Sequence, residues 1–126
     1  MLINISPTLS PDLLFHLRSM GHGEQLILAD ANFPSNKYNK NIIRLDGVNI
    51  PEATEAILSV FPLDSFSVKN GNFSAYRMEV DNQPKKLTQT HKEFIKIVKR
   101  VSGKNWKVGS IEREEFYTIA KKAYCI

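Results

Sequence analysis

Residues 20–34, the stretch on which the fold depends, are Met-Gly-His-Gly-Glu-Gln-Leu-Ile-Leu-Ala-Asp-Ala-Asn-Phe-Pro. A helical pattern of apolar residues ends at Met20, and Gly21 stands where helices commonly stop in the left-handed conformation. The nearly continuous apolar run over residues 25–29 then predicts a short strand that is covered on both faces. His22 precedes this strand between two glycines, and Asp30 follows where the apolar run ends. We take these two side chains as the first members of a candidate site.

Predicted helices and strands alternate along the chain around this stretch. Ser10, Pro11 and Asp12 combine an N-cap hydroxyl, a first-turn proline and a first-turn acid, so they predict a helix up to Met20. The further expected elements are a polar loop at residues 36–40, a strand at 42–45, a helix from Pro51 that ends before Pro62, a strand at 73–80, a basic helix at 87–101, a short strand at 106–108 and a last helix capped by Ser110. This order favours an α/β layered domain over an all-helical bundle.

Composition places the chain among ordinary globular proteins. Its 126 residues suit one domain, residues 1–126, and 42% of them are hydrophobic. No apolar run approaches the roughly 18 residues of a membrane span, and the first residues lack the pattern of a signal peptide. The single cysteine, Cys125, cannot form an internal disulfide. We therefore expect a cytoplasmic protein without membrane association.

His22 and Asp30 each have a functional and a structural interpretation. His22 can exchange protons in a site, or it is a loop histidine beside a helix-terminating glycine. An acid at the end of a buried strand is costly unless it is paired or faces a cleft, and ligand sites favour strand ends in α/β sheets. The structural alternative for Asp30 is to cap the turn at residues 31–34. Because a strand rises about 3.3 Å per residue, the eight positions between them keep the pair too far apart to share a hydrogen bond, unless the loop folds back or another subunit completes the pocket.

Arg113 is placed in the first turn of the last helix, where the helix dipole disfavours a cation. This position indicates that Arg113 binds a partner carboxylate or a ligand hydroxyl. A salt bridge to Glu112 or Glu114 is the alternative. Tyr117 lies one turn further along and belongs either to the core or to a pocket.

Nucleic-acid and metal sites are weakly indicated. The net charge is +4, and lysines gather on the polar face of the helix at residues 87–101, but no aromatic platform or recognised binding motif accompanies them. A solvated helix face explains them better. Three histidines and one cysteine show no metal-ligand spacing, and the sequence contains no phosphate loop or nucleophile elbow. We expect neither nucleic acid nor a metal.

Several short motifs together resemble the ribose pyranase and L-fucose mutarotase family (RbsD/FucU type). They span most of the chain in the family's order, and two of them, Arg-Leu-Asp-Gly and Phe-Tyr, are more similar to the fucose mutarotase branch. The matching pieces are Ile5-Ser6-Pro7, Leu9-Ser10-Pro11, Met20-Gly21-His22-Gly23, Ala29-Asp30-Ala31-Asn32-Phe33-Pro34, Ile43-Arg44-Leu45-Asp46-Gly47, Phe61-Pro62-Leu63-Asp64, and Phe116-Tyr117 with Ala120-Lys121-Lys122-Ala123.

The resemblance implies a mixed sheet flanked by helices and a cofactor-free sugar mutarotase. It also implies a ring-shaped homo-oligomer, such as a decamer, with sites between neighbouring subunits. The family's catalytic histidine falls on His22, and its substrate-binding aspartate and arginine fall on Asp30 and Arg113; Tyr117 is assigned to the same site. Family members continue through a Tyr-Gly-Asn motif, so we expect a C-terminal strand region with its sugar-contacting residues to be missing here.

The expected activity is the interconversion of anomers of a monosaccharide, with L-fucose the preferred candidate. Opening of the hemiacetal requires protonation of the ring oxygen and loss of the anomeric hydroxyl proton, which a histidine can mediate near neutrality. His22 is the expected acid/base, while Asp30 and Arg113 orient hydroxyls; Asp30 as a second proton carrier is the alternative. The rival function is a non-catalytic carbohydrate-binding or scaffolding protein with the same fold.

Overall fold

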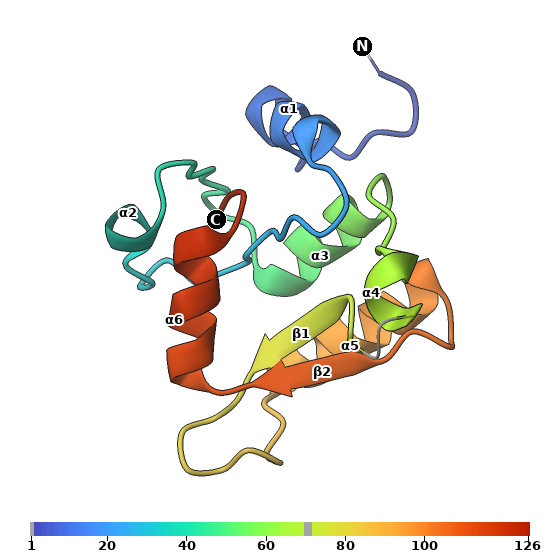
Figure 1. Cartoon of the computed structure of the whole chain (residues 1–126). Helices are drawn as coiled ribbons and strands as arrows, with labels where there is room; N and C mark the ends of the chain where they lie inside the picture. The colour runs from blue at the N-terminus through green and yellow to red at the C-terminus, as the bar shows by residue number, and fades with distance from the viewer. Residues whose placement is uncertain (1, 70–71) are drawn as a thin grey trace.

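Helices and strands alternate in the computed structural model, which describes residues 2–69 and 72–126 (Figure 1). This confirms the α/β class. The elements within the described residues are α1 (Pro11–Ser19), α2 (Ser35–Tyr38), α3 (Ile50–Leu58), α4 (Ser65–Lys69), β1 (Ala75–Met78), α5 (Gln89–Ser102), β2 (Val108–Ile111) and α6 (Arg113–Lys122).

The apolar run over residues 25–29 lies extended between two hydrophobic clusters. Leu26 and Leu28 pack against the first cluster, which Leu13, Leu17 and Ile57 of α1 and α3 help to form. Ile27 and Ala29 pack against the second, around Ala120 and Ala123 at the end of α6. Alternate side chains therefore enter opposite halves of the core, as the apolar pattern predicts. The predicted strand at residues 25–29 is wrong as a regular element, because only Leu26 of this segment forms a bridge.

The last residues of the chain pair with this extended segment. Leu26 forms a parallel bridge with Cys125, and the Ile27 N–H donates to the Cys125 carbonyl at 3.0 Å. On the other side, the Ile43 N–H donates to the Ile126 carbonyl at 3.0 Å. The predicted strand at residues 42–45 is wrong as a regular element, because this edge pairs with Ile126 alone and forms no ladder.

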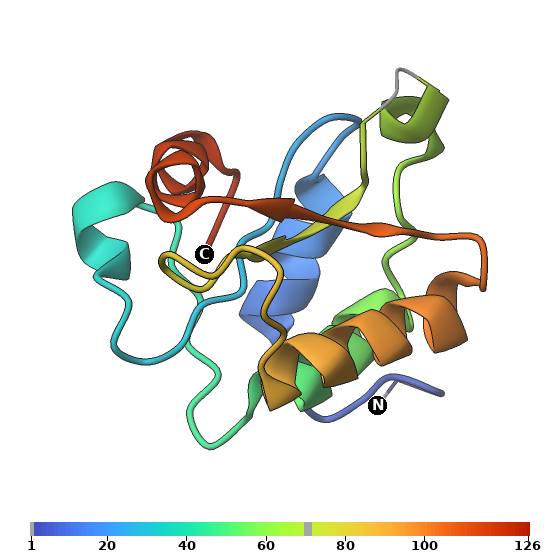
Figure 2. The ribbon, with the colours of Figure 1, turned by 90° about the horizontal axis from the view of Figure 1, so that it is seen from below.

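β1 and β2 form a parallel pair that α5 connects (Figure 2). A parallel pair needs such a crossover, and α5 in turn packs against α3. The predicted strand at residues 73–80 and the basic helix are confirmed. The sheet is smaller than expected, and its ladder is parallel. β2 begins at Val108, where the predicted short strand ends.

Three local predictions are wrong. Ser110 does not cap α6: β2 continues through it, its hydroxyl donates to Glu79 Oε1 at 2.8 Å, and Glu112 is the N-cap. The polar loop at residues 36–40 contains the short helix α2, which lacks the apolar periodicity of a longer helix. Gly21 is not left-handed, because Met20 ends α1 in an extended conformation; Gly23 has the positive φ, +79°.

No helix in the described part of the chain is long and apolar enough to cross a membrane.

Substitution of Ile27 tests the central position of the extended segment. Ile27→Ala leaves a cavity beside Ala120 and Ile126, so we expect the free energy of unfolding to fall by about 2–5 kcal/mol. Ile3→Ala is the matched control, because Ile3 is 87% exposed. Urea unfolding at one fixed protein concentration measures both. Equal stability of the two variants would contradict the proposed role of the segment.

The Cys125 thiol is fully buried, and burial raises its pKa from the ordinary 9.0 to about 11. Asp12 and Glu24 add a smaller increase through their negative charge. Since the thiolate is the reactive form, the folded protein keeps this group inert at neutral pH.

We expect Cys125 to react slowly with an aromatic disulfide reagent at pH 8 and rapidly after unfolding in urea. Folding raises the pKa of Cys125, so the buried neutral thiol contributes to the free energy of unfolding. This contribution is complete below pH 9 and is lost as pH rises from 9 to about 11. Absorbance of the released thiolate follows the reaction. Rapid labelling of the native protein at pH 8 would contradict the burial.

Candidate active site

His22 lies in the short loop between α1 and the extended segment. The Gly21 N–H donates to the Glu24 carboxylate at 2.7 Å, and the left-handed Gly23 turns the chain back. Only residues without a Cβ adopt this conformation readily. The loop leaves the His22 side chain 79% exposed. The imidazole is therefore available to a ligand or to another protein surface.

Asp64 and Phe66 contact the His22 ring from the start of α4. Asp64 Oδ1 lies 3.4 Å from His22 Nδ1, and the ring of Phe66 meets the imidazole edge-on with centroids 4.9 Å apart. The hydrogen bond from the Phe66 N–H lowers the pKa of Asp64 most, and the hydrogen bond from the Gly23 N–H and the charge of His22 lower it further. Partial desolvation acts in the opposite direction, but the pKa stays below its ordinary value. His22 therefore faces an ionised carboxylate at neutral pH.

Asp30 is exposed at the far end of the extended segment. Its Oδ1 accepts the Asn32 N–H at 2.7 Å, and its carbonyl accepts the Phe33 N–H at 3.0 Å. This is the turn-capping geometry that the sequence allowed as the structural alternative. The second carboxylate oxygen takes no part in that turn bond.

Arg113 opens α6 and pairs with Asp81, not with Glu112 or Glu114. Its Nη1 lies 2.7 Å from Asp81 Oδ2, and its Nη2 donates to the Tyr117 hydroxyl at 3.5 Å. These two partners, Tyr117 first, raise the pKa of the guanidinium. The carboxylate of Asp81 thus offsets the unfavourable interaction of Arg113 with the helix dipole, as the position of Arg113 indicated.

Tyr117 is half-buried and belongs to both the core and a hollow. Its ring lies 5.3 Å from that of Phe33 and 5.0 Å from that of Tyr38. The hollow beside it has a volume of about 600 Å³, and its lining consists of Pro34, Tyr38, Arg113, Glu114, Tyr117, Thr118 and Lys121. The loop that begins at Asp30 therefore reaches the same surface as Arg113 and Tyr117.

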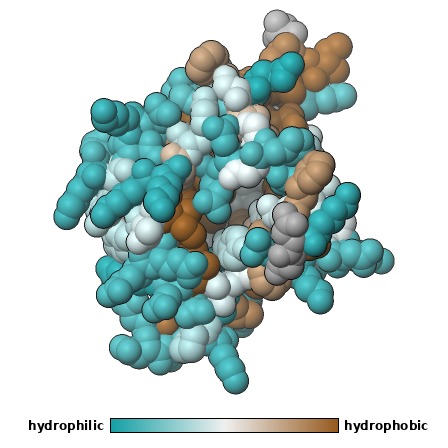
Figure 3. Space-filling view, viewed as in Figure 1, coloured by the Kyte–Doolittle hydropathy of each residue, from teal (hydrophilic) through white to brown (hydrophobic). Residues whose placement is uncertain are grey.

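The predicted site residues form two groups at opposite ends of the extended segment. His22 lies beside α4, whereas the Asp30 loop contacts α6 through Phe33 (Figure 1). His22 contacts Asp64, whereas Asp30 caps its own turn, so the two predicted side chains have separate partners in this structure. Hydrophilic side chains cover much of the α2–α6 side (Figure 3).

Asp64 and Asp81 are the contacts of the site that the sequence argument missed. Asp64 ends the quoted Phe-Pro-Leu-Asp motif, so a signal was present, but nothing local connected it with His22. Asp81 lies in none of the quoted motifs. Both become partners only when distant segments meet.

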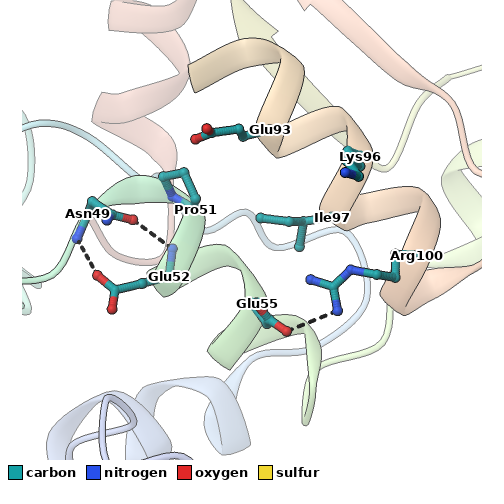
Figure 4. Close-up of a pocket in the computed structure, with 8 residues that line it drawn as sticks. All are labelled: Asn49, Pro51, Glu52, Glu55, Glu93, Lys96, Ile97 and Arg100. Carbon is teal, nitrogen blue, oxygen red and sulfur yellow. Dashed lines mark hydrogen bonds and ion pairs between the residues drawn. The ribbon is translucent and has the colours of Figure 1, made fainter. Parts of the chain in front are cut away.

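A second hollow, of about 380 Å³, lies between α3 and α5 and contains none of the predicted residues (Figure 4). Arg100 and Glu55 bridge it at 3.0 Å, and this bond lowers the pKa of Glu55. Glu52 and Glu93 add acidic groups on either side. The charged side chains that line this hollow are typical of a solvated groove between two helices.

Within residues 2–69 and 72–126, no group of three or more histidine, cysteine, aspartate or glutamate side chains could hold a metal ion.

A family model matches residues 3–126, and its description is the RbsD / FucU transport protein family. The L-fucose mutarotase of Haemophilus influenzae (strain 86-028NP) is 38% identical over 127 residues, covering 100% of this chain and 85% of that protein. The fucose mutarotase of Danio rerio is 38% identical over 130 residues, covering 97% of this chain and 80% of that protein.

The crystal structure of the fucose mutarotase from Streptococcus pneumoniae in complex with L-fucose is similar to this structure. The TM-score is 0.84 at 35% identity, covering 99% of this chain and 86% of that one. FucU from Bifidobacterium longum has a TM-score of 0.80 at 36% identity, covering 96% and 84% of the two chains. These likenesses extend over both ends of the extended segment.

Proposed function

The chain belongs to the RbsD/FucU family, and from that premise we propose that it is a sugar mutarotase whose substrate is L-fucose. The observation that carries the proposal is the match, over 100% and 97% of the chain, to an L-fucose mutarotase from a bacterium and a fucose mutarotase from a vertebrate. The exposed His22 and the polar hollow beside Arg113 supply groups suited to this reaction.

The reaction needs a group that gives and takes protons at neutral pH. His22 takes the proton of the anomeric hydroxyl, which becomes the aldehyde oxygen, and delivers a proton to the ring oxygen as the C1–O5 bond breaks. Closure on the other face of the aldehyde reverses both transfers, so no proton or electron is gained or lost. An imidazole suits this role, and positioned proton transfer contributes roughly 10²–10⁴-fold.

Asp30, Arg113 and Tyr117 bind the sugar in this proposal. A carboxylate and a guanidinium form the stronger, charge-assisted hydrogen bonds to hydroxyls. Asp30 keeps one oxygen outside its turn bond, and Arg113 keeps donors beyond those that contact Asp81 and Tyr117. Asp30 as a second proton carrier remains compatible with this arrangement.

Neighbouring copies of the chain complete the site. His22 and the Asp30–Arg113 surface lie at opposite ends of one extended segment, so a sugar that contacts both must lie between two subunits. The exposed rings of His22 and Phe66 offer a surface for this contact. A ring-shaped homo-oligomer, such as a decamer, repeats the contact at every interface.

Replacement of His22 tests the mutarotase. With His22→Ala we expect the enzyme-accelerated exchange between anomers to fall by about 10²–10⁴-fold, because the proton carrier is gone. Saturation-transfer NMR on the anomeric protons of L-fucose, D-ribose and D-galactose measures this exchange. His91→Ala, which removes an imidazole on α5, is the control.

A His22→Ala protein with the full exchange rate would refute the assignment. Sugar binding without acceleration by the wild type would identify a non-catalytic carbohydrate-binding protein instead.

Arg113→Ala should lower kcat/KM for the preferred sugar by about tenfold or more, because a charged donor to a hydroxyl is lost. Arg44→Ala is the matched control, since Arg44 is also exposed and paired with an aspartate, Asp46, at 2.7 Å. Exchange rates over a range of sugar concentrations separate KM from kcat. Equal rates in the two variants would remove Arg113 from the site.

A further inference from the structure

A tight turn after β1 carries Asp81 at the edge of the small sheet. β1 ends at Met78, and the Gln83 N–H donates to the Val80 carbonyl at 2.9 Å, which closes the turn. Asn82 lies within the turn in the left-handed conformation, with φ of +60°, which asparagine adopts more readily than most residues. The backbone on both sides of Asp81 is therefore fixed by the turn itself.

Two further hydrogen bonds tie this turn to the sheet. Before it, the Glu79 N–H donates to the Ile111 carbonyl of β2 at 2.8 Å. After it, the Pro84 carbonyl accepts from Arg77 Nη2 of β1 at 2.7 Å. The turn is thus anchored at both ends by groups other than the Asp81 side chain.

The parallel pairing of β1 and β2 brings this turn beside the start of α6. Met78 lies opposite Ile111, so the carboxyl ends of the two strands meet at one edge of the sheet. Asp81 lies in the turn that follows β1, and Arg113 opens the helix that follows β2. Ligand sites in α/β proteins favour this edge.

The guanidinium of Arg113 is held from two sides. Its Nη1 donates to Asp81 Oδ2 at 2.7 Å, and its Cζ lies 5.7 Å from the centroid of the Tyr117 ring. The bond from Nη2 to the Tyr117 hydroxyl is longer, at 3.5 Å, so the carboxylate is the closer partner. A guanidinium has five N–H donors in a planar fork. These contacts therefore orient the fork and leave donors for a ligand.

Asp81 acts on the hollow between α2 and α6 from outside it. Arg113 and Tyr117 belong to the lining of this hollow, whereas Asp81 does not. The side chains of Arg113 and Asp81 are each 54% exposed. Since an arginine side chain has large rotamer freedom, an exposed one without a partner samples many positions.

We propose that Asp81 is a positioning residue: it holds the guanidinium of Arg113 at the rim of the hollow before a sugar binds. A sugar hydroxyl then meets a donor that is already oriented, so binding does not have to order the side chain. The part of this inference that concerns the sugar rests on the proposed function of Arg113. Asp81 itself touches no substrate.

Other acidic residues lie near Arg113 on its own helix. Glu112 is the N-cap of α6, and Glu114 and Glu115 lie in the first turn. Among the residues that the structure describes, however, the ion pair of Arg113 is with Asp81. Replacement of Asp81 therefore removes the contact that orients the guanidinium and leaves the charges of α6 unchanged.

The first measurement requires no sugar. Nitrogen-15 NMR of arginine side chains follows rotation about the Nε–Cζ bond, and Arg113→Ala identifies the signals of Arg113. We expect this rotation to be several times slower in Arg113 than in the exposed Arg18, which forms no ion pair with any described residue. It should become as fast as that of Arg18 in Asp81→Ala. Equal rotation of the two arginines in the wild type would overturn the proposal.

The second measurement separates KM from kcat. In Asp81→Ala, the sugar must order the guanidinium in the bound state and in the transition state alike, so KM should rise with kcat nearly unchanged. We expect a two- to fivefold increase, about the size that couplings of exposed ion pairs reach. Asp81→Glu, which keeps the carboxylate, should restore part of the affinity and of the slow rotation.

Glu55→Ala is the matched control. Glu55 and Arg100 also form a pair between distant segments, at 3.0 Å and with each side chain 53% exposed, but they line the other hollow. We expect wild-type KM and kcat in this variant. Thermal unfolding of each variant shows whether a change in KM comes from loss of the fold.

Three results would overturn the role of Asp81. An unchanged KM in folded Asp81→Ala would show that the contact does not prepare Arg113. A lower KM would show that Asp81 competes with the sugar, and a lower kcat at constant KM would place Asp81 in the reaction itself. If the wild type accelerates no sugar, the mutarotase proposal fails, whereas the rotation of Arg113 still decides whether Asp81 holds it.

Discussion

Burial of an extended segment on both of its faces is the constraint on which the structure depends. Leu26 and Leu28 pack against one hydrophobic cluster, Ile27 and Ala29 belong to the other side, and the Ile27 N–H donates to the Cys125 carbonyl. Alternation with a period of two allows one short segment to join both halves of the core. A shift by one residue would exchange every side chain between the clusters, so packing determines the register.

This buried segment also sets the geometry of the site. Its ends emerge at the surface, one at the His22 loop and one at the turn of Asp30, and the segment between them cannot shorten without unpacking the core. Elements from elsewhere complete each end: α4 brings Asp64 and Phe66 to the first, while α2 and α6 surround the second (Figure 1). Under the proposed function, a sugar that contacts both ends lies between subunits.

The interactions that stabilise the fold differ from those that prepare the site. The core consists of buried aliphatic side chains, whereas the pair between Arg113 and Asp81 is more than half exposed. Exposed pairs are screened by water and contribute little to stability. In the proposed function, Arg113 exchanges part of its contact with Asp81 for a sugar hydroxyl at small cost to the fold. Asp64 is different, because the N–H groups of Gly23 and Phe66 hold its carboxylate in place independently of His22.

Helices with local signals were predictable from the sequence alone. The N-cap of α1 at Ser10, the proline and apolar spacing of α3, and the amphipathic pattern of α5 all act within a few residues, so their boundaries agree closely with expectation. The two-faced burial of the 25–29 segment was also predictable, because an uninterrupted apolar run leaves no side for water. The family motifs likewise indicated His22, Asp30 and Arg113.

Only the tertiary structure decided which partners these residues have. Gly23 and Asp64 are 41 positions apart, and Arg113 and Asp81 are 32 apart, so no local pattern connects them. The same reason explains the incorrect cap at Ser110 and the missing strand at residues 42–45: each depended on whether a distant segment offered a backbone partner. The sequence determined the types of element and the chemistry of the candidate residues. Packing of the chain decided their neighbours, because hydrogen bonds and ion pairs form with whatever the fold places beside them.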